Sequence, residues 1–458
     1  MFFLPLKKIN QEYMKGFKAY DIRGVYNKDF NKEDVYKLGY FLPELTDVDK
    51  ILVGRDVRES SQEIFDNLVR GVNDRGVDVY DIGLSTTPMV YYATGKHEFK
   101  TSVQITASHN PKEYNGFKIS GENVVPIGFE NGLNKLQDLV KNGKITLSKT
   151  KGKIIPFDIK KEYVEFLNKY KNKNIFSLKM GIDCSNGMAG MLIKEFLGDK
   201  PNYIHCEPDG RFPNHEPNPL EPINQRDIKK LVLQEECDIG VIFDGDGDRV
   251  MFIDQRGDFI SPDLIIALMG NYFLKNPNEN VLQDIRTSKS VKEYLKRYNA
   301  HIHTWRVGRA FAATKLREID GLYGGELAGH YYFRDFYYSD SGILAALIVL
   351  DIAADFKEKG VALSTVIEQI SNYKSSGELN FKIEDKEGAM ENLKKNFTAA
   401  EEPLEILDFD GYRIEFKDWW FNVRPSNTEP YLRLIVEATN EHLLDKKVDE
   451  IKKILNQY

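Results

Sequence analysis

Short apolar runs alternate along the chain with amphipathic stretches rich in lysine and glutamate. Strand-like apolar runs occupy residues 50–55, 101–108, 180–185 and 238–245, and helical stretches such as Ser60 to Arg75 and Asp227 to Glu236 follow most of them. This alternation predicts repeated β-α units built on parallel or mixed sheets. We find no self-similarity with a period of 20–50 residues, so a solenoid is not expected.

A coarser recurrence suggests how the chain divides. A strand followed by a polar loop occurs at Ile105–Ile119, Val241–Ile253 and Leu322–Phe333, with a spacing of roughly 100 residues, which is the size of a domain. Linker-like stretches occupy residues 141–153, 254–258 and 372–379. The last of them precedes two strand-like runs, WWFNVRPS and YLRLIVEA, and a closing helix over residues 442–458.

These signals predict an α/β protein of four domains, in which three related α/β domains with mixed sheets precede a smaller α+β domain. The expected limits are residues 1–152, 153–256, 257–371 and 372–458.

Composition narrows the class of protein. The 458 residues are 41% hydrophobic and 29% charged, which is typical of a globular protein, and the net charge of −7 comes without the basic stripe expected of a nucleic-acid binder. Cys184, Cys206 and Cys237 are too few and too widely spaced for a disulfide framework. The apolar run Ile343 to Leu350 is far shorter than the ~18 residues that span a bilayer, and the apolar N-terminus has no basic residue before it. We expect a cytoplasmic protein that acts on a small molecule, without nucleic-acid or membrane partners.

The segment Thr106 to Pro111 places a serine on a turn after an apolar strand. Ser108 has His109 beside it as a candidate proton carrier, and Asn110 and Lys118 follow. A hydroxyl in this setting suits a nucleophile or a phosphate carrier. An ordinary Ser/Asn turn is the alternative that the segment alone leaves open.

Asp244, Asp246 and Asp248 alternate with glycines directly after a strand. Neighbouring carboxylates a few Å apart repel by ~4 kcal/mol per pair at an effective dielectric constant near 20, so a hard divalent cation is their usual partner. An EF-hand is rejected because Arg249 stands at the glycine position and Gln255 at the final glutamate position. Three carboxylates do not fill the shell of Mg²⁺, so water or a phosphate oxygen has to complete it. A solvated acidic turn is the second interpretation of this segment.

Two later loops carry further candidates. Gly324 to His330 places Glu326 and His330 on a glycine-rich loop that a ligand can approach closely. Arg424 to Pro430 offers a guanidinium, two hydroxyls and backbone N–H groups, a combination that suits a phosphate. Taken singly, the first loop is also a common glycine turn and the second a common hairpin.

Together these loops closely resemble the α-D-phosphohexomutase superfamily, in particular its bacterial phosphomannomutase/phosphoglucomutase group. The resemblance follows the order of the family's motifs over essentially the whole chain. The matching segments are Tyr20 to Gly24, TASHNP with Tyr114 to Lys118, PDGRFPNHEPNPL at Pro208–Leu220, DGDGDR, GGELAGH and RPSNTEP. It implies that the four domains surround a central cleft.

The resemblance also implies roles for single residues. Ser108 would be the phosphoserine and, with the three aspartates, a ligand of Mg²⁺. His109 and Lys118 would assist proton transfer, and Arg23 and Arg249 would lie beside the transferring phosphate. The expected substrate-binding residues are Tyr20, Arg286, Arg309, Glu326, Ala328, His330, Arg424, Ser426, Asn427 and Thr428.

The implied activity is the interconversion of hexose 1-phosphate and hexose 6-phosphate, of mannose, glucose or both, through a hexose 1,6-bisphosphate that also serves as activator. Ala328 departs from the serine that is common in the family's sugar loop, so the sugar preference does not transfer directly. Phosphoglucosamine mutase is the alternative mutase, although Leu327 stands where that group typically has glutamine. Two alternatives to a mutase are also considered: an aspartyl-phosphate phosphatase and a sugar-phosphate binding protein without catalytic activity. Monomer and homodimer stay open.

Overall fold

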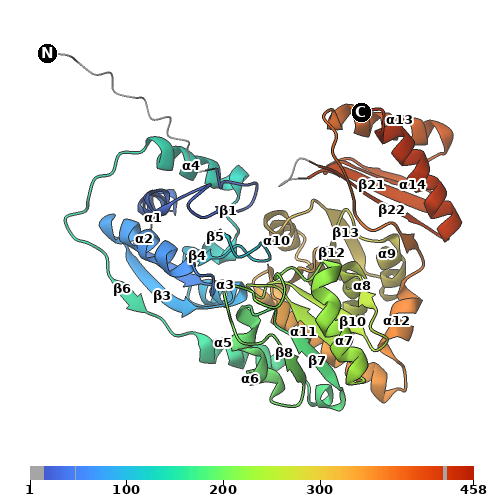
Figure 1. Ribbon diagram of the computed structural model, residues 1–458, viewed down its shortest axis with the longest axis horizontal. Helices are drawn as coiled ribbons and strands as arrows, with labels where there is room; N and C mark the ends of the chain where they lie inside the picture. The colour runs from blue at the N-terminus through green and yellow to red at the C-terminus, as the bar shows by residue number, and fades with distance from the viewer. Residues whose placement is uncertain (1–14, 47, 427–430) are drawn as a thin grey trace.

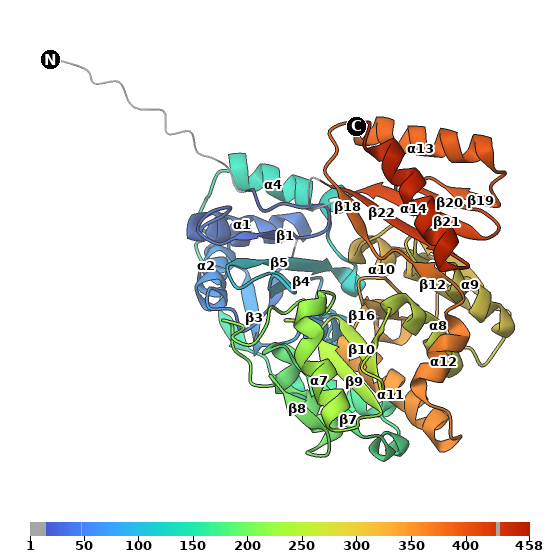
Figure 2. The same ribbon diagram turned by 45° about the vertical axis from the view of Figure 1, so that its right-hand side comes forward.

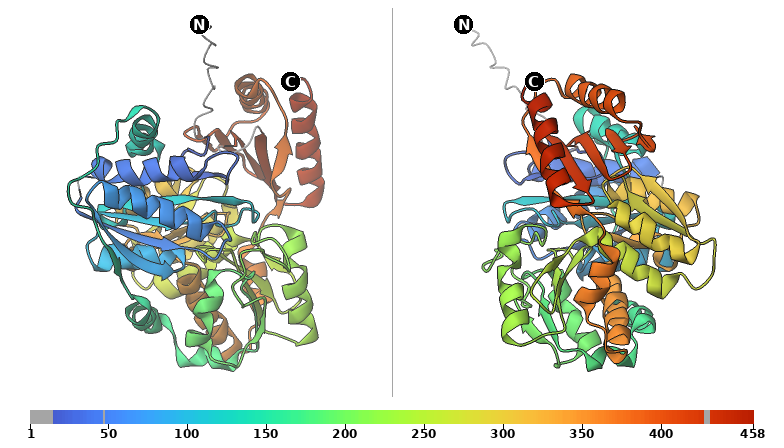
Figure 3. Two further views of the ribbon diagram at one scale, coloured as in Figure 1. Left: turned by 60° about the vertical axis from the view of Figure 1, so that its left-hand side comes forward. Right: turned by 90° about the vertical axis from the view of Figure 1, so that its right-hand side faces the viewer.

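The computed structural model describes residues 15–46, 48–426 and 431–458, and their strands form four sheets. The four units follow one another around the molecule, from the first on the left of Figure 1, through the second at the bottom and the third on the right, to the last at the top right. Figure 2 and both views of Figure 3 also place the last unit at the top and the second at the bottom. The predicted α/β architecture of three mixed-sheet domains and a smaller α+β domain is confirmed.

The first sheet has the order β1-β5-β4-β2-β3-β6, in which β2 pairs in parallel with β3 and β4, while β5 runs antiparallel to β4. The sheet extends past residue 152, because β6 pairs with β3. Its strands are β1 (Ile22–Val25), β2 (Lys50–Arg55), β3 (Asp78–Leu84), β4 (Thr101–Ile105), β5 (Tyr114–Gly121) and β6 (Ile154–Pro156). The accompanying helices are α1 (Lys32–Thr46), α2 (Ser61–Asp74), α3 (Thr87–Lys96) and α4 (Leu133–Asn142).

The second sheet has the order β11-β10-β9-β7-β8, with β7 parallel to β8 and β9 and with β10 antiparallel to β9. The turn at residues 254–258 joins two strands of this sheet, β10 and β11, so the sheet extends past residue 256. The elements are β7 (Met180–Asp183), β8 (Asn202–Ile204), β9 (Ile239–Phe243), β10 (Val250–Asp254), β11 (Phe259–Ile260), α5 (Lys160–Leu167), α6 (Ile193–Leu197) and α7 (Arg226–Gln234).

The third sheet repeats this pattern in the order β13-β12-β14-β15-β16, with β12 parallel to β13 and β14 and with β15 antiparallel to β14. Its strands are β12 (Asn280–Asp284), β13 (His301–Trp305), β14 (Tyr323–Gly325), β15 (Tyr331–Phe333) and β16 (Ser339–Asp340). The helices are α8 (Pro262–Phe273), α9 (Lys289–Leu295), α10 (Arg309–Glu318), α11 (Gly342–Glu358) and α12 (Leu363–Ile370).

The last sheet is antiparallel throughout its described pairs and has the order β17-β22-β21-β20-β19, with β18 also on β22. Its strands are β17 (Lys374–Ser375), β18 (Leu379–Phe381), β19 (Glu405–Leu407), β20 (Tyr412–Glu415), β21 (Trp419–Pro425) and β22 (Leu432–Ala438). Two helices, α13 (Lys386–Ala400) and α14 (Glu441–Leu455), pack against this sheet.

Apolar packing joins the second and third units into one core. The helix α11, whose first nine residues are all apolar, packs against α8 of its own unit and against β9 and β10 of the second. Residues of α3 in the first unit belong to the same buried cluster. The first and last units have separate cores of their own. In the part of the chain that the structure describes, no helix combines the length and the apolarity needed to cross a membrane.

Candidate active site

One cleft of about 1480 Å³ is lined by residues from all four units. Three of its walls are equivalent turns, because in each of the first three sheets the turn joins a central strand to its antiparallel neighbour. The turn from β4 to β5 carries Ser108, the turn from β9 to β10 carries Asp244 to Asp248, and the turn from β14 to β15 carries Glu326 to His330. The end of β21 supplies Arg424. The recurrence seen in the sequence therefore has a topological basis.

Ser108 is buried, and its backbone is in the left-handed region with φ of 52°. Its amide donates a hydrogen bond to Thr106 Oγ1 at 2.9 Å, and its hydroxyl donates to Asp244 Oδ2 at 2.8 Å. The turn of the first unit thus brings its serine hydroxyl into direct contact with the acidic turn of the second.

Asp244, Asp246 and Asp248 are fully buried, with one carboxylate oxygen from each within 4.8 Å of the others. Lys118 Nζ contacts Asp248 and lies 2.7 Å from Asp246 Oδ2, which also accepts from Thr87 Oγ1 at 2.5 Å. Asp246 Oδ1 and Asp248 Oδ1 have no hydrogen-bond partner among the described residues. Buried carboxylate oxygens of this kind are costly unless a cation or a donor satisfies them, so the donor set fits a hard divalent ion.

The charge of the cluster changes the pKa of its members. Burial, and then Asp246 and Asp248, raises the pKa of the Asp244 carboxyl well above its ordinary value. Burial has the largest single effect and would lower the pKa of Lys118, but Asp246, Asp248 and Asp244 together outweigh it and raise the pKa. The ammonium of Lys118 therefore stays charged and offsets part of the negative charge around Ser108.

His109 and two arginines lie beside the serine. Burial first, and then Arg249 and Arg23, lowers the pKa of His109 well below its ordinary value, and its Nδ1 has no hydrogen-bond partner in the described part of the chain. Arg23 donates to Asp21 and Asn110, while Arg249 Nε lies 4.0 Å from an oxygen of Asp244. The arrangement joins a neutral imidazole to two guanidinium groups, which suit an anion that reacts at Ser108.

On the third unit, His330 is held by an aspartate that the sequence did not single out. His330 Nδ1 lies 2.6 Å from Asp340 Oδ2, and Arg309 Nε donates to the other oxygen of Asp340 at 3.2 Å. Asp340 is fully buried and does not line the cleft, so its effect is to orient the two side chains that do. In the sequence, Asp340 stands just before the apolar run Ile343 to Leu350, and no motif includes it.

Glu326 is buried, and burial raises the pKa of its carboxyl. Tyr332 donates its hydroxyl to Glu326 Oε1 at 2.7 Å, and Arg286 Nη2 lies 3.9 Å from Oε2. Ala328 lines the cleft on the same turn and offers only a methyl group. A carboxylate oriented in this way can accept hydrogen bonds from the hydroxyls of a sugar.

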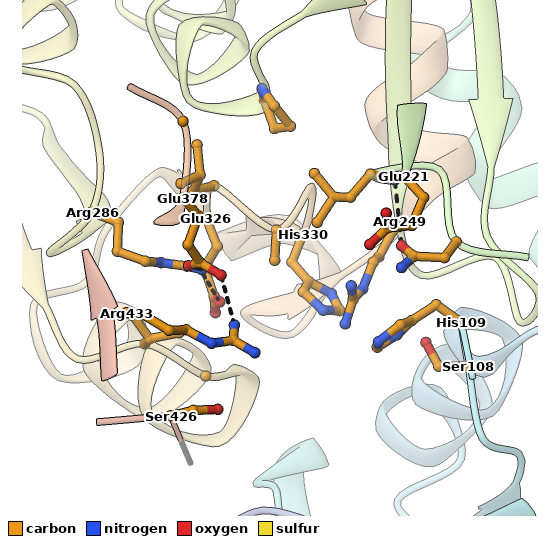
Figure 4. A pocket seen from close by; sticks show the side chains of 18 of the residues that line it. Ser108, His109, Glu221, Arg249, Arg286, Glu326, His330, Glu378, Ser426 and Arg433 are labelled. Carbon is orange, nitrogen blue, oxygen red and sulfur yellow. Dashed lines mark hydrogen bonds and ion pairs between the residues drawn. The ribbon is translucent and has the colours of Figure 1, made fainter. Parts of the chain in front are cut away.

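The far wall of the cleft is cationic. Arg424 is buried, and among the described residues its Nε has no hydrogen-bond partner and no carboxylate lies within 4.0 Å of its guanidinium. Burial first, and Arg286 next, lowers its pKa. Arg433 of this wall, which no sequence motif indicated, binds Glu378 at 2.9 Å. Figure 4 shows Ser108 and His109 on one side, Glu326 together with Arg286, Arg433 and Ser426 on the other, and His330 between the two groups.

The structure brings the predicted set together. The described members that line the cleft are Tyr20, Arg23, Ser108, His109, Lys118, Arg249, Arg286, Arg309, Glu326, Ala328, His330, Arg424 and Ser426, with the three aspartates directly behind Ser108. Asn427 and Thr428 lie outside the described residues. The sequence motifs missed Asp340, Tyr332 and Arg433. They also missed Thr87 and Arg58, whose contacts join segments far apart in the chain.

Comparison with known proteins agrees with this geometry. Family descriptions of phosphoglucomutase/phosphomannomutase match in chain order: the alpha/beta/alpha domains I, II and III at residues 14–145, 161–257 and 261–373, and the C-terminal domain at 378–454. The chain is 35% identical over 447 residues to a phosphomannomutase of Methanocaldococcus jannaschii, with 96% of this chain and 97% of that protein covered. It is also 35% identical over 454 residues to a phosphomannomutase of Escherichia coli K12, with 96% and 99% covered.

A crystal structure of a phosphoglucomutase/phosphomannomutase family protein from Burkholderia thailandensis has a similar fold, with a TM-score of 0.85, 28% sequence identity and 97% of each chain covered. The chain belongs to the phosphoglucomutase/phosphomannomutase family, whose members are phosphohexomutases and therefore isomerases.

Proposed function

We propose that the protein interconverts hexose 1-phosphate and hexose 6-phosphate, with phosphorylated Ser108 as the phosphoryl carrier and a hexose 1,6-bisphosphate as the intermediate. The observation that carries this proposal is the 2.8 Å contact between the Ser108 hydroxyl and the buried acidic turn, at one end of a cleft whose far wall is cationic. Phosphoryl transfer depends mainly on positioning and on charge stabilisation, and this arrangement supplies both.

The reaction balances without a further reactant. In the first step the bond from phosphorus to Ser108 Oγ breaks and a bond to O6 of the hexose 1-phosphate forms, which gives the 1,6-bisphosphate. The proton of the 6-hydroxyl goes to a neighbouring base. His109 is placed for this role, because it lies in the cleft beside Ser108 and its Nδ1 has no hydrogen-bond partner among the described residues. The bisphosphate then turns over in the cleft. The bond from phosphorus to O1 breaks as a bond to Ser108 Oγ forms again, and the base returns its proton to O1.

The residues around Ser108 support this role. Asp244, Asp246 and Asp248, together with an oxygen on Ser108, would hold Mg²⁺, which when bound neutralises charge on the transferring phosphoryl group. Lys118, Arg23 and Arg249 would stabilise the same charge from their places beside the serine.

The remaining contacts divide between the sugar and its second phosphate. Glu326, Ala328 and His330 would face the sugar hydroxyls, with Tyr20 and Arg309 beside them. The non-reacting phosphate would lie against Arg286, Arg424, Ser426, Asn427 and Thr428, and each end of the bisphosphate would occupy that place in turn.

We propose mannose and glucose phosphates as the substrates. The two sugars differ only at C2, and a site that binds their remaining hydroxyls accepts both. Relatives 35% identical to this chain are named phosphomannomutase, which favours mannose as one of the two sugars.

Three further properties stay predictions from the sequence. They are the domain limits at residues 152, 256 and 371, a cytoplasmic location, and a monomeric or homodimeric state.

A coupled assay of mannose, glucose and glucosamine 1-phosphates tests the proposal, with Mg²⁺ and a trace of the matching bisphosphate present. We expect turnover of mannose and glucose phosphates that is lost when Mg²⁺ is chelated and returns when it is restored. Turnover of glucosamine phosphate alone would favour a phosphoglucosamine mutase. Release of inorganic phosphate without isomerisation would favour a phosphatase.

A further inference from the structure

A single buried guanidinium lies beneath the turn that carries Ser108. Arg58 Nη2 donates to the carbonyl oxygens of Ser108 at 2.8 Å and Asn110 at 2.7 Å, and its Nη1 donates to those of Pro111 at 2.6 Å and Tyr114 at 3.0 Å. Four carbonyl groups of one turn therefore converge on one side chain. The Arg58 side chain has 0% exposure and does not line the cleft.

Arg58 is itself held in place. Its Nε donates to Asp56 Oδ2 at 3.0 Å, and the second oxygen of Asp56 accepts from the Arg58 amide and from Ser61 Oγ. A guanidinium has five N–H donors, and here each has an acceptor: four carbonyls of the turn and one carboxylate. Such a buried charge is stable only while its partners keep their geometry, so the guanidinium fixes the position of the turn.

The turn requires such support, because Ser108 has φ of 52°, a conformation that residues with a side chain rarely adopt. A residue in this region keeps it when its surroundings determine its backbone from several sides. The contact from Arg58 to the carbonyl of Ser108 itself is one of these constraints. Without it, the serine could relax toward a common conformation and its hydroxyl would move.

The second unit closes on the far side of Arg58. Its segment Pro208–Leu220 is the motif that has no role in the proposed chemistry. The ring of Phe212 lies 5.1 Å from the Arg58 guanidinium, and Gly210 packs so closely that a Cβ there would be 2.3 Å from the carbonyl oxygen of Val57. Arg58 is therefore enclosed between the serine turn and this segment.

The same segment also contacts the acidic turn. A Cβ on Gly245 would lie 2.5 Å from the carbonyl oxygen of Ser108 and 3.2 Å from Pro217 Cβ. The serine turn, the segment Pro208–Leu220 and the acidic turn thus pack on one another without spare space. A shift of the serine turn would change the contact between the Ser108 hydroxyl and Asp244.

We propose that Arg58 is a positioning residue for phosphoryl transfer, which fixes the Ser108 turn against the acidic turn and does not itself touch the substrate. This inference rests on the proposed function, since it assigns to Arg58 the alignment of the serine that carries the phosphoryl group. Misplacement of a reacting group by about 1 Å can cost on the order of a hundredfold in rate.

The test compares Arg58→Lys and Arg58→Met with the wild-type enzyme. Lysine keeps the charge but has three donors on one atom, so it cannot satisfy five acceptors. We expect kcat to fall by roughly ten- to a hundredfold in the lysine variant and further in the methionine variant, where tenfold corresponds to about 1.4 kcal/mol. KM should change less than about threefold, because the sugar and phosphate contacts lie on different turns.

Arg55→Met is the matched control. Arg55 is the last residue of β2, three positions before Arg58, and its side chain pairs with Asp81 at 2.9 Å and stacks on Phe65 at 4.3 Å, away from the Ser108 turn. Its loss should lower the melting temperature with kcat unchanged. Phe212→Leu removes only the ring against Arg58 and should lower kcat less than Arg58→Lys does, which provides a test if Arg58→Met does not fold.

Folded Arg58→Lys and Phe212→Leu enzymes with wild-type kcat would overturn the inference. So would a defect confined to KM, or an equal loss of kcat in Arg55→Met. Ser108→Ala separates this failure from failure of the proposed function. An active Ser108→Ala enzyme contradicts the proposed function, whereas an inactive one beside a fully active Arg58→Lys enzyme contradicts only the role of Arg58.

Discussion

Replacing Arg424 with alanine should weaken substrate binding far more than it slows the chemical step. The Arg424 guanidinium is buried, its Nε has no partner among the described residues, and its pKa is lowered first by burial and then by Arg286. A cation in such a position is satisfied when an anion arrives, and a phosphate can accept two parallel N–H bonds from it.

The magnitude follows from the hydrogen bonds that are lost. A hydrogen bond to a charged group contributes about 1.5–3 kcal/mol, and each 1.4 kcal/mol corresponds to about tenfold in affinity. Water replaces part of the lost contact, so we count the net loss as one such bond, and Arg424→Ala should raise KM by about ten- to a hundredfold. Arg424→Lys should recover only part of the loss, because an ammonium keeps the charge but lacks the planar pair of donors.

The assay measures KM and kcat in both reaction directions. The 1-phosphate and the 6-phosphate each place their non-reacting phosphate at this wall, so KM should rise for both isomers, with a smaller fall in kcat. Arg256→Ala is the control, because Arg256 is half exposed and does not line the cleft. A defect confined to one isomer, or none, would refute the role of Arg424 in a shared phosphate site.

Three more substitutions test the site and its surroundings. Ser108→Ala should abolish isomerisation while hexose phosphate still binds in calorimetry, and a fully active variant in the presence of bisphosphate would contradict this. Ala328→Ser adds a hydroxyl to the sugar-facing turn and should raise kcat/KM at most about tenfold, since a neutral hydrogen bond contributes about 0.5–1.5 kcal/mol; an unchanged or lower value would show that the site packs around the methyl group. Burial first, and then Asp263, raises the pKa of Glu437 from 4.5 to about 7. Protonated Glu437 therefore adds up to about 3 kcal/mol to the free energy of unfolding below pH 4.5, and this contribution is lost as the pH rises through 7. Urea unfolding at pH 5 and pH 8 should show this loss in the wild type and a smaller one in Glu437→Gln, and equal losses would contradict the assignment.

The strands were predictable because apolar runs mark them, but their ends were not. Ser108 was expected on a turn after its strand, and β4 does end before it, at Ile105. The apolar run at 180–185 is longer than the strand that it marks, because β7 ends at Asp183. Ser108 and Ser185 both have positive φ, with values of 52° and 51°. Neither residue is glycine, so nothing in the local sequence indicates a left-handed turn, and tertiary contacts impose it.

The chemistry within each turn was also predictable, because the acidic, serine and glycine-rich motifs are local. The contacts between turns were not. Lys118 binds Asp246 across 128 positions, and Arg58 binds the Ser108 carbonyl across 50. These contacts depend on how the first sheet is placed against the second, and periodicity in one strand carries no information about that placement.

The most direct test of the central claim is to map the phosphoryl group itself. The enzyme is incubated with Mg²⁺ and a hexose 1,6-bisphosphate labelled in phosphorus, digested under acidic conditions and analysed by mass spectrometry. We predict label on the peptide that contains Ser108, at close to one phosphoryl group per chain, and transfer of that label to added hexose 1-phosphate at a rate no slower than turnover. Label on Asp244, Asp246 or Asp248, or turnover with Ser108 never phosphorylated, would contradict it.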